Sequence, residues 1–291
     1  MLHKPVLLRE VLELLVLNKN GLYVDGTVGT GGHAIAILKT LGEEGRIIAM
    51  DRDPQALETA RSVLSQYAQK IIFIRDRFSK IHENLTSMNI AEVDGILLDL
   101  GMSNPQIQSS GRGFSFLKDE PLDMRMDPDL KLTAKDVVNT YREKELARLL
   151  KDFGEEDKAQ KIAKAIVHQR KIRKIETSKE LAELVARAKN AKYSRIHPAT
   201  KTFMALRIHI NDELSELKIF LESAPRLLTH KGRLCIISYH SLEDRMVKTS
   251  FNSLKNHGFQ VITKKPIRPS RDEIQENPSA RSAKLRIIER S

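Results

Sequence analysis

The chain has 291 residues, and its 49 Lys and Arg residues against 38 Asp and Glu give a formal net charge of +11. This length allows two domains, and 41% hydrophobic residues are enough to fill a core, which excludes a disordered chain. The longest apolar runs, at residues 96–98 and 234–237, fall far short of the ~18 residues that a membrane span requires.

Arg9 and Glu10 precede any apolar stretch long enough for a signal peptide, and the single cysteine suits a reducing compartment. We therefore expect a cytoplasmic protein with no membrane partner. The excess positive charge favours a polyanionic partner such as a nucleic acid, with an ordinary solvated surface as the alternative.

The first hundred residues alternate short apolar runs with helical patterns, which predicts parallel βαβ units. The expected strands are 22–26, 46–51, 71–76 and 93–100, and the expected helices between them are 33–41 and 54–69. The nearly all-apolar centre of the fourth strand predicts that it is covered on both faces. Strand patterns return at 232–238, 259–263 and 283–289, whereas 264–282 has the composition of a loop. The fold class expected is α/β, with a doubly wound, Rossmann-like sheet.

Strand patterns are missing between residues 109 and 197, where the sequence becomes helical and basic, with 21 Lys and Arg against 15 Asp and Glu. Within it, residues 158–174 hold seven bases and no acid, and Ile162 and Ile166 add an apolar stripe. This pattern predicts a helix with one buried and one basic face. We therefore expect a core formed by residues 1–108 and 198–291, with residues 109–197 inserted as a helical RNA-recognition domain.

The first expected strand runs into a turn, Asp25-Gly-Thr-Val-Gly-Thr-Gly-Gly-His33, with four glycines in seven residues. At the strand-to-helix junction of a doubly wound fold such a turn is typical of nucleotide binding, with a tight connection as the alternative. Asp51 lies twenty residues beyond Gly31, where an acid can accept hydrogen bonds from both hydroxyls of an adenosine ribose. A carboxylate at Asp25 would repel a pyrophosphate but attract an ammonium or sulfonium, so S-adenosylmethionine is favoured over NAD. The alternative for Asp25 is a carboxylate that caps a helix or orders the loop.

The fourth expected strand ends at Asp99, and Asn104 and Gln106 follow it at the same edge. Acceptors that bind the N–H protons of an exocyclic amine should raise its nucleophilicity, so Asp99 and Asn104 are candidate catalytic residues. A plain turn ordered by Pro105 is the alternative for Asn104. Methylation at carbon 5 of a pyrimidine would need a thiolate, and Cys235 lies in an apolar run typical of a core. No His and Cys cluster has ligand spacing, so we expect no metal.

These segments together closely resemble the bacterial ribosomal RNA small-subunit methyltransferase H family, over essentially the whole chain. The matching motifs are residues 3–10, 25–33, 51–54, 98–101, 112–116, 121–127, 197–200, 237–245 and 277–282. The chain departs from the family mildly, with Met102-Ser-Asn-Pro-Gln106 where Val-Ser-Ser-Pro-Gln is frequent. The resemblance implies methylation of N4 of a cytidine in the decoding region of 16S rRNA, with the small ribosomal subunit as partner.

The resemblance also implies that S-adenosylmethionine is the cofactor and that seven residues contact it: Gly31, Gly32, His33, Asp51, Phe78, Asp99 and Gln106. An apolar ring at Phe78 suits packing on adenine, with ordinary core packing as its alternative. The alternative for His33 is a polar residue in the first helical turn.

Four further residues are candidates for binding the substrate. Phe114 or Phe116 would stack on an extruded cytosine, or would anchor the inserted domain through apolar packing. Arg207 shares one helix face with Phe203 and Asn211 and would hold a phosphate or the cofactor carboxylate, or would pair with Glu213 or Asp212. His240 would orient the nucleotide, with a helix cap formed by Ser241 and Asp244 as the alternative explanation of its motif.

Two other functional classes share some of these features. An NAD-dependent oxidoreductase would use the same glycine turn and Asp51, but would have to tolerate Asp25 beside a pyrophosphate. A non-catalytic RNA-binding or ribosome-assembly factor would explain the charge but not the three acids expected along one sheet edge.

Overall fold

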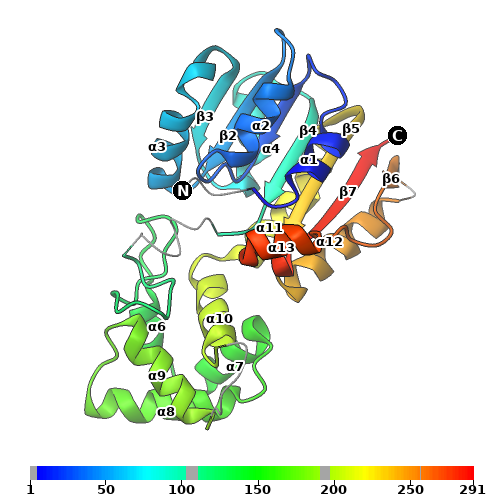
Figure 1. The fold of residues 1–291 in the computed structure, drawn as a ribbon. Coiled ribbons are helices and arrows are strands. Elements are labelled where there is room, and N and C mark those ends of the chain that lie inside the picture. The colour runs from blue at the N-terminus through cyan, green and yellow to red at the C-terminus, as the bar shows by residue number, and fades with distance from the viewer. Residues whose placement is uncertain (1–4, 103–110, 191–196, 256) are drawn as a thin grey trace. The chain divides into compact units, whose positions relative to one another are not determined.

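The computed structural model describes residues 5–102, 111–190, 197–255 and 257–291 of the chain. The chain forms two compact units, which we call the sheet unit and the helical unit. The sheet unit comprises Met1–Ser103 and Leu214–Ser291, and the helical unit comprises Asn104–Glu213. Figure 1 shows the strands and helices of the two units.

The sheet unit contains a seven-stranded sheet in the order β3-β2-β1-β4-β5-β7-β6. Strands β1 to β5 pair in parallel, whereas β7 pairs antiparallel with both β5 and β6. The α/β fold expected from the strand and helix alternation is confirmed. The strands are β1 (Leu22–Asp25), β2 (Arg46–Asp51), β3 (Ile71–Arg75), β4 (Val93–Asp99), β5 (Leu228–Ser238), β6 (Phe259–Val261) and β7 (Lys284–Arg290).

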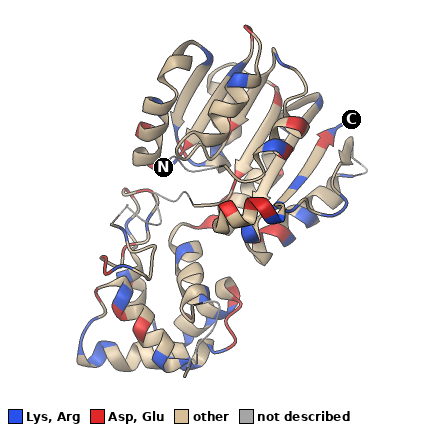
Figure 2. Ribbon diagram, in the orientation of Figure 1, with Lys and Arg blue, Asp and Glu red and all other residues tan. Residues whose placement is uncertain are grey.

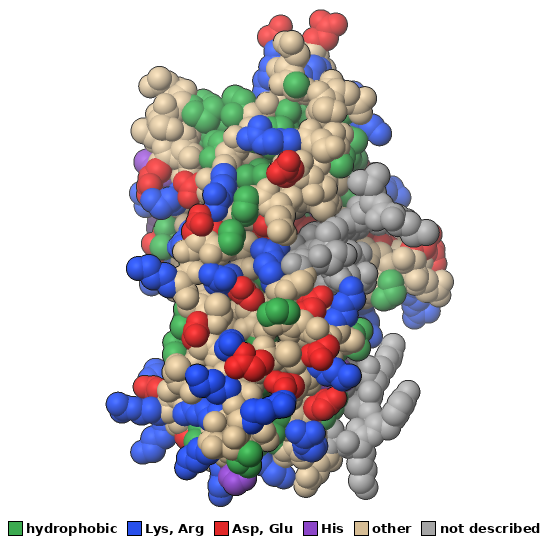
Figure 3. All heavy atoms as spheres, turned by 90° about the vertical axis from the view of Figure 1, so that its left-hand side faces the viewer, with side chains coloured by type: hydrophobic (Ala, Val, Ile, Leu, Met, Phe, Trp, Pro, Cys, Tyr) green, Lys and Arg blue, Asp and Glu red, His purple; other side chains and the backbone are tan. Residues whose placement is uncertain are grey.

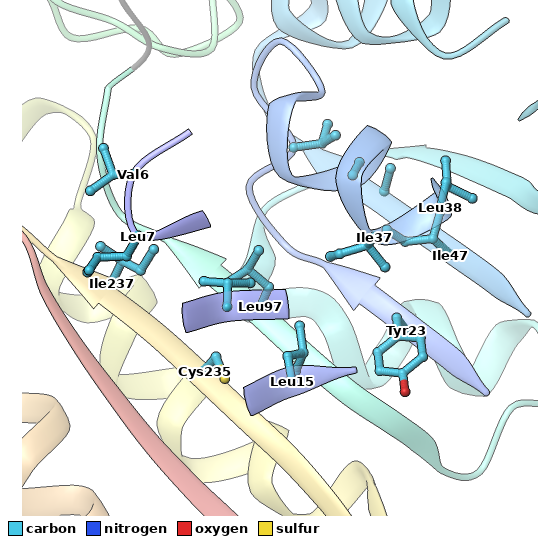
Figure 4. Packing of buried hydrophobic residues seen from close by; sticks show 14 of the residues in the cluster. Val6, Leu7, Leu15, Tyr23, Ile37, Leu38, Ile47, Leu97, Cys235 and Ile237 are labelled. Atoms are coloured by element: carbon cyan, nitrogen blue, oxygen red, sulfur yellow. The ribbon is translucent and has the colours of Figure 1, made fainter. Parts of the chain in front are cut away.

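Side chains of the sheet enter two cores, because successive residues of a strand point to opposite faces. Tyr23 and Leu97 belong to one core, and their chain neighbours Val24 and Ile96 belong to the other. Figure 4 shows the first core, where Leu15, Ile37 and Cys235 come from different elements. Its helices are α1 (Leu8–Leu15), α2 (Gly32–Thr40) and α3 (Pro54–Val63), and those of the second core are α4 (Ile81–Ser87), α11 (Glu213–Ser223) and α12 (Ser241–Leu254). Helices on both faces explain why β4 is apolar throughout its centre.

The strand order reverses at β1, which has β2 on one side and β4 on the other. In open α/β sheets, ligands bind outside the carboxyl ends of the strands at such a switch point. The sheet therefore places its binding edge where β1, β2 and β4 end.

Two predicted segments have a different secondary structure in the protein. The helix expected at 54–69 ends at Val63 and continues as a 3-10 turn, η1 (Ser65–Lys70), because no residue of η1 is buried to hold an amphipathic helix. The loop expected at 264–282 instead holds α13 (Arg271–Glu276) and the 3-10 turn η4 (Pro278–Ser282). The hydroxyl of Ser270 caps α13 by accepting the Glu273 N–H at 3.1 Å, a start signal that the apolar pattern does not reveal.

The helical unit is built from α6 (Ala134–Thr140), α7 (Glu143–Gly154), α8 (Ala159–Ile172), α9 (Ser178–Ala188) and α10 (Thr200–Ile210). Thr133 and Thr177 start α6 and α9 with reciprocal capping boxes. Helix α8 buries Ala159, Ile162, Ala163 and Ile166, which confirms the predicted apolar stripe. No helix in the described parts of the chain is both long and apolar enough to cross a bilayer.

Candidate active site

Three carboxylates lie along the binding edge of the sheet. Asp25, Asp51 and Asp99 are the last residues of β1, β2 and β4. Asp25 is in register with Ala49 of β2 and Leu97 of β4, so Asp51 and Asp99 lie two residues beyond it on either side. The structure thus brings together the three acids that the sequence analysis singled out.

The glycine-rich turn after β1 is fixed by its backbone conformation. Gly29 and Gly31 have φ angles of 51° and 87°, a region that residues with a Cβ atom rarely adopt. A Cβ at Gly31 would also lie 3.1 Å from the Leu64 Cδ1 atom. Gly32 then begins α2, so the turn carries the chain from β1 into a helix N-terminus beside the three acids.

Asp51 joins this turn to the start of α3. Its Oδ2 accepts the Gly29 N–H at 2.9 Å, and its Oδ1 accepts the Asp53 N–H at 2.9 Å. Burial raises the pKa of the Asp51 carboxyl to about 6, although both N–H donors oppose the rise. A carboxylate offers about four lone-pair sites, so two remain for further donors such as ribose hydroxyls.

Replacement of Asp51 by Ala is expected to weaken binding of S-adenosylmethionine about tenfold to a hundredfold, the range for losing a hydrogen bond to a charged group. Isothermal titration calorimetry measures this directly. The variant Asp51→Asn keeps an oxygen for the Gly29 N–H and separates loss of the turn from loss of the charge. Unchanged cofactor affinity in both variants would contradict this role.

Asp25 is a buried acid, with 1% of its surface exposed. Its Oδ1 accepts the Thr27 N–H at 3.2 Å. Burial raises the pKa of its carboxyl to about 7, and the negative charges of Asp99 and Asp51 add to the rise. A bound cation beside Asp25 would therefore stabilise its ionised form.

Asp99 takes part in two hydrogen bonds, one through its backbone and one through its side chain. Its own N–H donates to the Thr27 hydroxyl at 2.7 Å, and its Oδ1 accepts the Gly101 N–H at 3.2 Å. His33 Nδ1 lies 3.7 Å from its Oδ2, which is too long for a hydrogen bond. His33 is buried, and its Nε2 lies 3.0 Å from the carbonyl of Val6, which can only accept a proton. The backbone of Asp99 is therefore held by Thr27, and one of its carboxylate oxygens is held by the Gly101 N–H.

Phe78 begins the 3-10 turn η2 (Phe78–Lys80) after β3. Its ring meets Phe220 edge to face with centroids 5.5 Å apart, and it packs against the second core. A Cβ at Gly26 would lie 3.5 Å from the Phe78 Cβ, so the base of the Phe78 side chain lies beside the start of the glycine turn. The predicted contact with adenine stays a prediction. Two other predicted site residues, Asn104 and Gln106, lie outside the residues that the structure describes.

The remaining predicted substrate residues of the helical unit form contacts within that unit. Phe114 is buried, and the Arg112 guanidinium lies 5.5 Å from its ring centroid. Phe116 stacks on His197 at 4.3 Å and meets Phe203 edge to face at 5.5 Å. Both rings thus make packing contacts within the helical unit, as expected if they anchor that unit. Stacking of either ring on a base stays a prediction.

Arg207 forms a two-point ion pair with Glu213. Its Nε and its second terminal nitrogen donate to the two carboxylate oxygens at 2.8 and 2.9 Å. Of the two acids proposed as its structural partner, Glu213 pairs with it. Binding of a phosphate or cofactor carboxylate by Arg207 stays a prediction. The guanidinium would then have to bind that ligand and Glu213 together.

His240 is the N-cap of α12. Its Nδ1 accepts the Glu243 N–H at 3.3 Å, while Glu243 Oε2 accepts the Tyr239 N–H at 2.8 Å. The predicted alternative, a cap formed by Ser241 and Asp244, is wrong, because the capping pair is His240 and Glu243, one residue earlier in each case. Asp244 instead pairs with Arg286 at 2.6 Å and Lys284 at 3.1 Å, because its side chain faces the antiparallel strand β7.

Two residues of this edge were missed by the sequence analysis. Thr27 lies inside the glycine-rich turn, and its hydroxyl contacts the backbone of Asp99. Tyr239 directly precedes His240, and its ring packs against Gly101, where a Cβ atom would lie 2.6 Å from the ring atom Cε2. A hydroxyl within the turn and a tyrosine directly after a strand were the available signals. Neither signal predicts which distant residue the side chain contacts, such as Asp99, 72 residues beyond Thr27.

Cys235 lies within β5 and is fully buried. Burial raises the pKa of its thiol to about 12, so it stays protonated at neutral pH. This supports the interpretation of Cys235 as a core residue rather than a nucleophile.

Comparison with known proteins identifies the family of the chain. Curated relatives named "Ribosomal RNA small subunit methyltransferase H" are 42% identical in Clostridioides difficile, covering 99% of this chain and 98% of the relative, and 47% identical in Sulfurihydrogenibium sp. strain YO3AOP1, covering 98% of both. Among solved structures, TrmN from Thermus thermophilus has a TM-score of 0.47 at 14% identity, covering 98% of this chain and 48% of that one. The model of the MraW methylase family matches residues 1–291, and the chain therefore belongs to the MraW methylase family.

Proposed function

We propose that this protein transfers a methyl group from S-adenosylmethionine to N4 of a cytidine in the decoding region of 16S rRNA, on the small ribosomal subunit in the cytoplasm. The family match and the names of the relatives support an rRNA methyltransferase. The observation that carries the proposal is the placement of Asp25, Asp51 and Asp99 along one sheet edge beside the glycine turn. The specific nucleotide rests on the family resemblance.

The cofactor of this methyltransferase is S-adenosylmethionine, and the residues present fit it. Asp51 retains lone pairs for the ribose hydroxyls, and Asp25 provides a buried negative charge for the ammonium or sulfonium. The same charge is unsuited to a pyrophosphate, which disfavours an NAD-dependent oxidoreductase. S-adenosylmethionine supplies an electrophilic methyl group, whose bonding electron pair stays on sulfur when the acceptor nitrogen takes the methyl.

The chain itself contributes mainly positioning. Asp99, fixed by Gly101 and Thr27, accepts a hydrogen bond from an N–H of the cytosine amine and directs the nitrogen lone pair toward the methyl group. The proton that N4 loses after transfer passes to this carboxylate or to solvent. A non-catalytic assembly factor would not require this arrangement of acids.

We assign the rRNA contact of the helical unit to the basic face of α8. Lys161, Lys164 and Lys171 are exposed, opposite the buried stripe of Ile162 and Ile166. Figure 2 shows Lys and Arg along this helix, and Figure 3 shows them gathered at the lower end of the unit, where α8 lies in Figure 1. Such a face binds phosphates without reading sequence.

Charge reversal of this face, Lys161→Glu, Lys164→Glu and Lys171→Glu together, is expected to weaken rRNA binding at least tenfold and to reduce its salt dependence. Each lost phosphate contact lowers the slope of log K against log salt by about 0.7 to 0.9. Filter binding at several salt concentrations measures both. The control reverses the exposed Lys39, Lys218 and Lys248 of the sheet unit, which changes net charge equally. Equal losses in the two triple variants would assign the effect to net charge alone.

The proposed function is tested by incubating the protein with radiolabelled S-adenosylmethionine and small subunits that lack the modification, followed by nucleoside analysis of the rRNA. N4-methylcytidine is the expected product. Label on another base would keep the methyltransferase and overturn the specificity. Tight RNA binding without any label would favour the assembly factor.

A further inference from the structure

The turn that carries Phe78 follows the strand beside the acid predicted to bind the ribose. Arg75, the last residue of β3, is in register with Asp51 of β2, and Phe78 begins η2 three residues later. Short 3-10 turns have poor hydrogen-bond geometry, and the Lys80 N–H donates to the Arg77 carbonyl at 3.0 Å within this one. The position of the Phe78 ring therefore depends on contacts from outside the turn.

Glu216 of α11 contacts the residues on both sides of Phe78. Its Oε1 accepts a hydrogen bond from Arg77 Nη1 at 2.8 Å, and its Oε2 accepts one from the Ser79 hydroxyl. Both Glu216 and Ser79 are buried. Phe220 lies four residues after Glu216 on the same buried face of α11, and it meets the Phe78 ring edge to face. One helix face thus holds the ring and the residues on either side of it.

Stability alone does not require a carboxylate at this place. The other buried residues of α11 are apolar, namely Leu217, Phe220 and Leu221. A buried ion pair often contributes no more to stability than apolar side chains of similar volume, because both charges lose their hydration. Hydrogen bonds are directional, however, so they restrict the positions of their partners more narrowly than apolar contacts do.

We propose that Glu216 is a positioning residue for S-adenosylmethionine, which holds η2 so that the ring of Phe78 packs on the adenine. This inference rests on the predicted contact of Phe78 with adenine. Glu216 itself touches no part of the cofactor in this role. It lowers the Kd because the ring is already in place before the cofactor binds, whereas ordering a ring during binding would cost part of the affinity.

The test is a double-mutant cycle in cofactor binding, measured by calorimetry on the full chain. Phe78→Ala removes the ring and is expected to raise the Kd for S-adenosylmethionine about fivefold to a hundredfold, the range for loss of stacking on a base. Glu216→Gln places an amide N–H group against one of the two donors, and it should raise the Kd about threefold to thirtyfold. In a Phe78→Ala background it should change the Kd less than about twofold, because no ring is left to position.

A second ligand separates positioning from unfolding. 5′-Methylthioadenosine contains the adenine but not the amino-acid part of the cofactor, so Glu216→Gln should raise both Kd values by the same factor. Unfolding raises an apparent Kd only by the inverse of the folded fraction. A variant that urea unfolding shows to be more than half folded at the measuring temperature can therefore lose at most about twofold in this way.

Glu289→Gln is the matched control. Glu289 is also a buried carboxylate of the sheet unit, and its Oε2 accepts a hydrogen bond from Arg233 at 2.8 Å. Arg233 is in register with Gly95 near the start of β4, away from the binding edge. Glu289→Gln should therefore lower stability and change the Kd for S-adenosylmethionine less than about twofold.

Ser79→Ala is a milder test, because it removes a single hydroxyl donor to Glu216, and it should raise the Kd about twofold to tenfold. Unchanged Kd values in both Glu216→Gln and Ser79→Ala, or equal factors in the presence and absence of Phe78, would overturn the proposal. An unchanged Kd in Phe78→Ala would overturn it through the adenine contact on which it rests. Failure of the wild-type protein to methylate rRNA would instead overturn the proposed function.

Discussion

Replacement of Asp99 by Ala is expected to lower the rate of methyl transfer at least about a hundredfold, the lower end of the range for a positioned proton acceptor. The loss follows from the position of Asp99 at the end of β4, where Gly101 and Thr27 fix it. Single-turnover transfer to unmodified small subunits measures the rate, and calorimetry measures cofactor binding. Asp99 is also predicted to contact the cofactor. The Kd for S-adenosylmethionine should therefore rise in Asp99→Ala, but by less than about tenfold.

Asp94 provides the matched control, since it lies in the same strand near the opposite end. Its carboxylate accepts the Leu22 N–H at 2.8 Å and an Asn18 amide N–H at 3.0 Å. Asp94→Asn should lower stability without lowering the rate per folded molecule. If Asp99→Ala weakens cofactor binding as much as it slows transfer, Asp99 binds the cofactor and does not position the amine.

Replacement of Asp25 by Asn is expected to stabilise the free protein at pH 8 and to weaken cofactor binding at least about tenfold. The wild-type pKa of about 7 lies above the value of 3.8 for an unperturbed carboxyl. Between these values the folded protein keeps a proton that the unfolded chain releases, so wild-type stability falls as the pH rises from about 4 to about 7. The stabilisation by Asn should therefore reach about 2–4 kcal/mol at pH 8 and disappear below pH 4.

Thermal and urea unfolding across this pH range checks the stability, and calorimetry in buffers of different ionisation enthalpy checks the binding. Near pH 6.5 the wild-type protein should release protons when it binds the cofactor, because a cation favours ionised Asp25. Glu216→Gln is the contrasting variant. Glu216 is also buried, but it accepts hydrogen bonds from Arg77 at 2.8 Å and from Ser79. Glu216→Gln should therefore destabilise the protein. If Asp25→Asn also destabilises the protein at pH 8, the buried charge of Asp25 does not reduce stability in the way proposed here.

The periodicity of apolar residues and the residues typical of turns were sufficient to predict most of the strands and helices of the sheet unit. The observed ends of β1, β2, β3 and β4 lie within one residue of the predicted ends. These strands are buried on both faces of the sheet, so they form continuous apolar runs that can be recognised in the sequence. The spacing of Asp25, Asp51 and Asp99 also follows from local information, since each acid ends a strand. Parallel strands bring such ends to one edge of the sheet. The basic face of α8 was likewise readable, because helical spacing separates its lysines from Ile162 and Ile166.

Only the tertiary structure decided which partner each polar side chain meets. Arg207 pairs with Glu213, His240 caps α12, and Asp244 pairs with a strand 40 residues away. A sequence gives the residue type and the face on which it lies, but hydrogen bonds depend on distances of about 3 Å across segments that only packing brings together. The packing of the Tyr239 ring against Gly101 is the clearest case, because it requires the register of β4 against β5 and a residue without a side chain at position 101. Local periodicity therefore fixed the binding edge, whereas long-range packing fixed the orientation of the groups on it.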